Sequence, residues 1–63
     1  MINNLEMMMW LNGKIKETEK EIKYIRETLM EVNGPALGLI SALEAEEEKL
    51  QSYKEAYASY ENK

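Results

Sequence analysis

The sequence predicts an all-α fold: an antiparallel hairpin of two helices that pack like a coiled coil. Three observations indicate this fold: one strong break near mid-chain, an apolar seven-residue repeat on each side of it, and equal lengths for the two repeats. A chain of 63 residues is long enough for one domain. We therefore expect a single domain over residues 1–63, with helices at about 4–32 and 36–61 and a turn at 33–35.

The break is the tripeptide Asn33-Gly34-Pro35. Asn and Gly favour the left-handed backbone that ends a helix, and Pro suits the first position of the next helix. A second start signal follows, because Ser41 with Glu44 three residues later has the form of a capping box. The second helix could therefore begin at Pro35 or at Ser41, and the apolar repeat favours Pro35.

The first repeat alternates spacings of three and four residues, which is typical of a coiled-coil seam. It passes unbroken through Asn12-Gly13, although Asn-Gly is turn chemistry. Because one interior glycine costs only about 1 kcal/mol, we expect the first helix to be continuous there. Seven of the eight seam residues are apolar: Met8, Leu11, Ile15, Thr18, Ile22, Ile25, Leu29 and Val32.

The second repeat keeps the same rhythm, so the two seams can be paired. If the chain folds back at Gly34, each residue of the first seam should meet the residue of the second seam that is the same number of positions from Gly34. Val32 then meets Ala36 near the turn, and Met8 meets Tyr60 at the far end. The second seam consists of Ala36, Leu39, Leu43, Glu46, Leu50, Tyr53, Tyr57 and Tyr60.

Glu46 is the polar member of the second seam, and it should lie beside Thr18 of the first. A polar layer of this kind can fix the register and the oligomeric state of a coiled coil, at a cost in stability. The tyrosines Tyr53, Tyr57 and Tyr60 could form an adhesive aromatic edge. Their seam positions favour core packing, with the hydroxyls at the rim.

The composition argues against most enzymatic chemistry. The sequence contains no histidine and no cysteine, and all twelve of its acidic residues are glutamate. Without histidine or cysteine there is no thiolate site, no disulfide and no Glu-x-x-His pair of a di-iron bundle. None of the three glycines lies in a phosphate-binding loop. We therefore expect a non-enzymatic protein with no catalytic, cofactor-binding or metal site.

The net charge of -4 disfavours direct binding to nucleic acid or to an anionic membrane. The start of the chain lacks the basic segment of a signal peptide, and the uncharged run Met7 to Leu11 is far shorter than the roughly 20 residues of a membrane span. We expect a cytoplasmic protein, located in the host cytoplasm if it is virus-encoded. The bias toward Lys, Ile, Asn and Glu is typical of AT-rich genomes, including those of phages.

A lone hairpin buries one stripe per helix, which is too little to offset an ordering cost of about 1.5 kcal/mol per residue. We therefore expect a partner that covers the remaining apolar surface, either a second copy that completes a four-helix bundle or a different protein. Small side chains beside the second seam, Ala42, Ala45 and Ala56, would let another helix approach. The candidate partner-binding residues are apolar and lie off the seam: Met7, Met9, Trp10, Tyr24, Leu37 and Ile40.

These features indicate a small regulator or inhibitor that binds a partner protein and occludes its surface, as viral accessory proteins do. The Met-Trp run would be part of that recognition surface, or it would only cover the end of the bundle. Two other functions stay open. The chain could be a scaffold whose only partner is itself. The acidic patch Glu44, Glu47 and Glu48 could imitate nucleic acid, although such runs are usually solvated helix faces.

Overall fold

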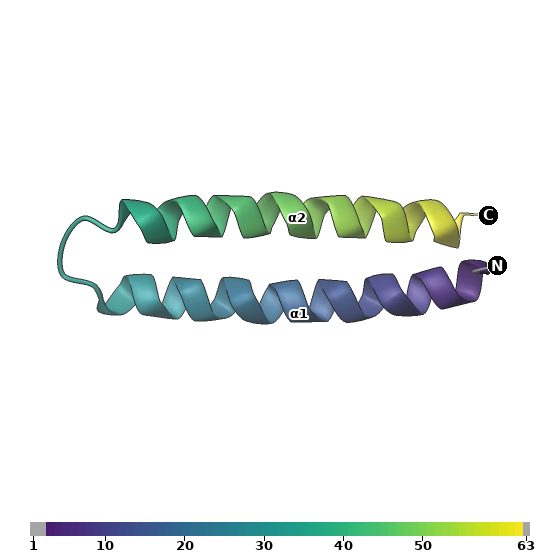
Figure 1. Ribbon diagram of the computed structural model, residues 1–63, viewed down its shortest axis with the longest axis horizontal. Coiled ribbons are helices and arrows are strands. Elements are labelled where there is room, and N and C mark those ends of the chain that lie inside the picture. The colour runs from purple at the N-terminus through teal and green to yellow at the C-terminus, as the bar shows by residue number, and fades with distance from the viewer. Residues whose placement is uncertain (1–2, 63) are drawn as a thin grey trace.

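The structure, a computed structural model that describes residues 3–62, consists of two helices and one loop (Figure 1). α1 spans Asn4–Glu31 and α2 spans Leu37–Glu61. The helices run antiparallel and side by side, as a rod with extents of 48 × 18 × 14 Å. This arrangement confirms the predicted all-helical hairpin. Within the described residues, neither helix combines the length and the apolar character that crossing a membrane requires.

α1 starts at a side-chain cap. The Asn3 Oδ1 accepts a hydrogen bond from the backbone N–H of Glu6 at 2.8 Å, and Glu6 adds a negative charge to the first turn. The helix then runs without interruption through Asn12 and Gly13, as the unbroken repeat predicted. It ends at Glu31 and is capped by Val32, whose backbone is extended and whose N–H donates to the Leu29 carbonyl at 3.3 Å.

The loop between the helices depends on glycine at one position. Gly34 has a φ of +145°, in a region that residues with a Cβ rarely adopt. Pro35 lies before the helix, and the first hydrogen bond of α2 runs from the N–H of Ile40 to the Ala36 carbonyl at 3.0 Å. α2 therefore begins between the two predicted starts, because the reversal uses residues 32–36, and Ser41 lies inside the helix.

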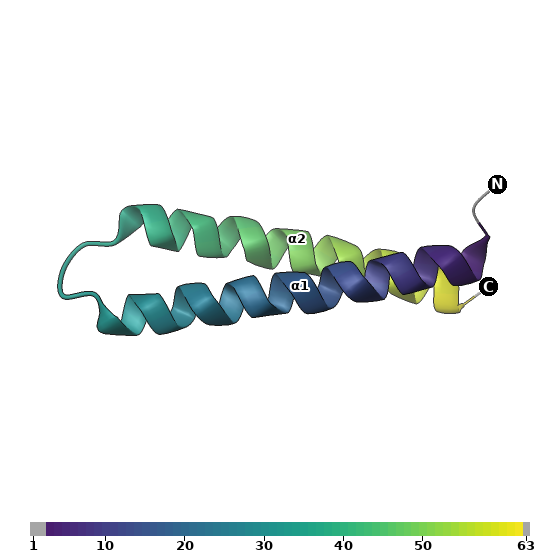
Figure 2. The same ribbon diagram turned by 60° about the horizontal axis from the view of Figure 1, so that its bottom comes forward.

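The core of the hairpin lies along the predicted pair of seams, except at the seam residue Val32, which is 38% exposed. Leu11, Ile22 and Ile25 are only 3, 5 and 8% exposed, and the polar seam residue Thr18 is 4% exposed. All eight residues of the second seam are half-buried, whereas most residues between them are exposed. The helices cross at a shallow angle, so that the start of α1 passes in front of the end of α2 in Figure 2. Such a crossing is typical of coiled-coil packing.

Two ion pairs bridge the helices in one register. An Arg26 Nη2 lies 3.4 Å from a Glu47 Oε1, and the Lys54 Nζ lies 3.9 Å from a Glu19 Oε2. In both pairs, the α2 residue is five positions farther from Gly34 along the chain than the α1 residue is. All four side chains are about half exposed, and exposed pairs contribute at most about 1 kcal/mol each. They therefore mark the register more than they stabilise it.

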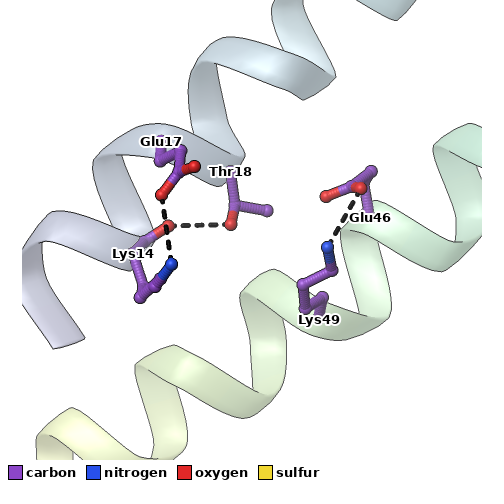
Figure 3. A network of polar contacts seen from close by, with 5 residues as sticks. All are labelled: Lys14, Glu17, Thr18, Glu46 and Lys49. Carbon is purple, nitrogen blue, oxygen red and sulfur yellow. Dashed lines mark hydrogen bonds and ion pairs between the residues drawn. The ribbon is translucent and has the colours of Figure 1, made fainter.

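The polar seam residues Thr18 and Glu46 face each other from the two helices, but each finds its partner within its own helix (Figure 3). The Thr18 hydroxyl donates to the Lys14 carbonyl at 2.7 Å, and the Lys49 ammonium donates to Glu46 at 3.2 Å. The hydrogen bond and the charge of Glu46 raise the pKa of Lys49. Among residues 3–62, no buried side-chain nitrogen or oxygen is left without a partner, so the layer is tolerated.

Candidate functional site

The rod has two broad faces, one on each side of the plane that contains the helix axes (Figure 1). In a coiled coil, residues seven positions apart lie on one stripe along the helix. The contacts of one residue therefore show on which face of the rod its whole stripe lies. The groove face is the one that carries the Arg26–Glu47 and Glu19–Lys54 ion pairs. The aromatic face is the opposite one, where Trp10 packs on Tyr53.

A groove of about 570 Å³ runs along the groove face. Its floor is formed by Ile22 and Leu50, one apolar seam residue from each helix. Long side chains form its walls, and among them Met30 is 85% exposed. The remaining wall residues are charged or carry an amide: Glu19, Lys23, Arg26, Glu27, Glu47, Gln51 and Lys54.

The groove face also carries most of the exposed apolar surface. The seven-residue spacing places Met9 on the stripe of Lys23 and Met30, and Leu37 on the stripe of Gln51. The same spacing places Ile40 on the stripe of Glu47 and Leu5 on that of Glu19. Five of the eight exposed large apolar residues thus lie here: Leu5, Met9, Met30, Leu37 and Ile40, which are 66, 67, 85, 76 and 43% exposed.

On the aromatic face, Trp10 is held between two side chains. Its ring meets that of Tyr53 with a centroid distance of 6.1 Å and an interplanar angle of 87°. The Lys14 ammonium lies 5.6 Å from the centroid of the indole and 3.5 Å from a carboxylate oxygen of Glu17. Trp10 nevertheless remains 51% exposed. The indole therefore contacts a side chain from each helix and still has half of its surface open to a partner.

The stripes of Lys14 and Glu17 extend the aromatic face along α1. Tyr24 lies seven residues after Glu17 and is 67% exposed, whereas Met7 lies seven residues before Lys14 and is half-buried. The small α2 residues that were expected to admit another helix, Ala42, Ala45 and Ala56, occupy stripes of this same face. The aromatic face therefore has a bulky edge on α1 and a flat edge on α2.

The six candidate partner-binding residues consequently do not form one patch. Met7, Trp10 and Tyr24 lie on the aromatic face, and the other three, Met9, Leu37 and Ile40, lie on the groove face. They are the candidates because they are apolar and lie off the seam, and this criterion does not distinguish the two sides of a seam. Met30 and Leu5 also meet this criterion but were not among the six candidates, and their spacing from Lys23 and Glu19 places them on the groove face.

The acidic run at residues 44–49 is partly neutralised by cations. Glu47 pairs with Arg26 across the helices, and Glu46 pairs with Lys49 one turn away, while Glu44 and Glu48 are exposed. Across residues 3–62, no three acidic side chains come together as they would to hold a metal ion. The run behaves as a solvated helix face on which half of the four carboxylates have partners.

The chain matches none of the family models, curated proteins or solved structures with which it was compared. The physical chemistry of the groove face and of the aromatic face is therefore what points to a function.

Proposed function

We propose that this chain is a non-enzymatic protein-interaction module, a small regulator or inhibitor that binds a partner protein and covers part of its surface. The observation that carries this proposal is the balance of apolar surface. Among residues 3–62, eight large apolar residues remain at least 38% exposed, whereas the buried residues are only Leu11, Thr18, Ile22 and Ile25. When exposed apolar side chains gather on one face of a protein, that face usually binds another protein.

The aromatic face is the recognition surface in this proposal, with Trp10 as its anchor. Trp is the residue type most enriched among the contacts that dominate binding energy. Tyr53 and Lys14 already hold the indole, so little side-chain freedom is lost when a partner covers its exposed half. Tyr24 supplies a second aromatic contact on the same stripe, about 21 Å farther along the helix.

The charges beside these aromatic residues indicate the chemistry of the partner. On the α1 edge of this face, the three acidic residues Glu17, Glu21 and Glu31 outnumber the one cation, Lys14. A surface with apolar pockets rimmed by Lys and Arg would complement this face, and the net charge of -4 would speed its encounter with such a surface.

The test is affinity capture with the whole chain as bait, using extract from its source cell. A variant with Trp10→Ala and Tyr24→Ala should lose a protein that the wild type retains. A Lys20→Ala variant, altered at an exposed position on the back of α1, should retain that protein. Circular dichroism at the same temperature must show that all three baits are helical. Equal capture by the wild type and the double variant would refute the proposed recognition surface.

Self-assembly is the second candidate function, and one observation favours it. The groove face offers five of the eight exposed large apolar residues together with charged residues of both signs. A pure scaffold would bind copies of itself and nothing else. Capture of no protein by the wild type, together with a stable oligomer, would favour this function over the regulator.

A further inference from the structure

We propose that a second copy of this chain packs on the groove face with both loops at the same end, giving a four-helix bundle. The inference rests on the second candidate function, self-assembly, and adds to it the face, the orientation and the contacts, whereas the face that would recognise a different protein lies on the opposite side. The charges along the two edges of the groove face, its apolar content and its area all favour this arrangement.

The two outer edges of the groove face differ in charge. Lys23 and Met30 line the groove from α1, and Gln51 lines it from α2. Seven-residue spacing gives the rest of each edge. The α1 edge, which is basic in its middle, consists of Met9, Lys16, Lys23 and Met30. The α2 edge carries one acidic residue and three uncharged residues: Leu37, Glu44, Gln51 and Ala58.

A two-fold axis parallel to the helices would place each α1 edge against the α2 edge of the other copy. Because the two edges run in opposite directions, residues equally far from the loop would then meet. Met30 would contact the partner's Leu37, and Lys23 would lie beside the partner's Glu44. Each of these contacts would occur twice, so they would give two pairs of opposite charge and two apolar pairs.

The opposite orientation, with the loops at different ends, would place each α1 edge against the same edge of the partner. Lys16 and Lys23 would then lie against the partner's Lys23 and the partner's Lys16. Like charges that face each other across an interface are unfavourable and select against such an arrangement. The charge pattern therefore favours the bundle in which the loops share one end.

The size and the apolar content of the groove face suit a stable dimer. The broad side of the rod measures 48 × 18 Å, a projected area of about 860 Å², close to the roughly 800 Å² that each partner buries in a typical stable complex. Pairing would cover the groove floor at Ile22 and Leu50. It would also bring Met30, Leu37 and Ile40 of both copies together near the loops. The surface that one hairpin leaves exposed would thus become a second core.

The proposed pairing of Lys23 with the partner's Glu44 can be tested by measuring dimerisation of two single variants and of their mixture by analytical ultracentrifugation. Lys23→Glu and Glu44→Lys should each weaken dimerisation by about tenfold or more, since two opposite-charge pairs become like-charge pairs. An equimolar mixture should form a heterodimer about as stable as the wild-type dimer, because every substituted position then faces an opposite charge. Lys20→Glu, on the back of α1, should change the dimer little. Monomeric wild type at all concentrations, or dimers indifferent to both substitutions, would overturn the proposal.

The orientation can be measured separately, because the sequence contains no cysteine. A spin label on an Asn33→Cys variant would report the distance between the two loops. Loops at one end should give about 20 Å, or two helix diameters. A distance near the 48 Å length of the rod would overturn the parallel arrangement. The variant with Trp10→Ala and Tyr24→Ala should stay dimeric. The dimer proposal and the proposed recognition surface can therefore be refuted independently of each other.

Discussion

Trp10 and Tyr53 meet edge to face across the two helices, with ring centroids 6.1 Å apart and an interplanar angle of 87°. An edge-to-face pair contributes about 0.5–1.5 kcal/mol beyond the area that it buries. Tyr53 is a seam residue, whereas Trp10 lies off the seam and is 51% exposed. The contact therefore links the core of the hairpin to the surface that we propose for recognition.

Replacing Tyr53 with leucine should isolate the contribution of this ring pair. The Tyr53→Leu variant keeps an apolar seam residue, so we expect a loss of about 1 kcal/mol in the free energy of unfolding. The fluorescence of Trp10 should shift to the red as its ring becomes more exposed. Urea denaturation followed by circular dichroism measures the loss. Tyr24→Leu, at a position that is 67% exposed, is the control and should change stability little. Unchanged stability and emission in Tyr53→Leu would contradict this account.

Truncating a buried seam residue should have a much larger effect. Ile25 is 8% exposed, so Ile25→Ala should lower the free energy of unfolding by about 2–4 kcal/mol. In a chain this small, such a loss would leave a large unfolded fraction at 37 °C. Glu27→Ala, at an exposed position of the same helix, should stay within about 0.5 kcal/mol of the wild type. Similar melting curves for the two variants would mean that the seam is not the core.

The seams could be predicted from the sequence because a rod of two helices can bury only one stripe of each helix. A stripe that repeats every seven residues has to face the other helix, and even Thr18 is buried there because its hydroxyl can bond to the Lys14 carbonyl. The start of α2 was harder to predict, since Pro35 and Ser41 carry local signals while the reversal of the chain decides the outcome. The side of the rod on which Trp10 and Met9 lie follows only after the seam register is known.

The seam glutamate should cost stability. The side chain of Glu46 is 23% exposed and has its cation on the same helix. Glu46→Leu removes a partly buried charge and adds apolar contact, so we expect a gain of about 1–2 kcal/mol, less the small contribution of one exposed ion pair. Thermal denaturation should show a higher melting temperature. Glu46→Gln, which removes only the charge, should fall between the two proteins. A lower melting temperature for Glu46→Leu would indicate that the carboxylate is required for packing.

The ion pair of Lys49 with Glu46 should also be visible in the pH dependence. The hydrogen bond and the charge of Glu46 raise the pKa of Lys49 above its ordinary value of 10.5. Because the folded-state pKa is the higher one, the stabilisation is fully present below pH 10.5 and is lost as pH rises through the folded-state pKa. A titration of the Lys49 side chain by NMR should show a lower midpoint in the Glu46→Gln variant. Equal midpoints in the two proteins would exclude this pairing.

The same substitution should have opposite effects at two glycines. Gly13 lies inside α1, and a Cβ added there would meet no atom within 4 Å, so Gly13→Ala should stabilise the helix by up to about 1 kcal/mol. Gly34 has a φ of +145°, which alanine adopts only with strain, so Gly34→Ala should destabilise the hairpin by about 1–3 kcal/mol. Urea denaturation of both variants measures the two effects under one set of conditions. Destabilisation by Gly13→Ala would mean that α1 needs the freedom of glycine at this point, and that its continuity through Asn12-Gly13 is not the conformation the chain prefers.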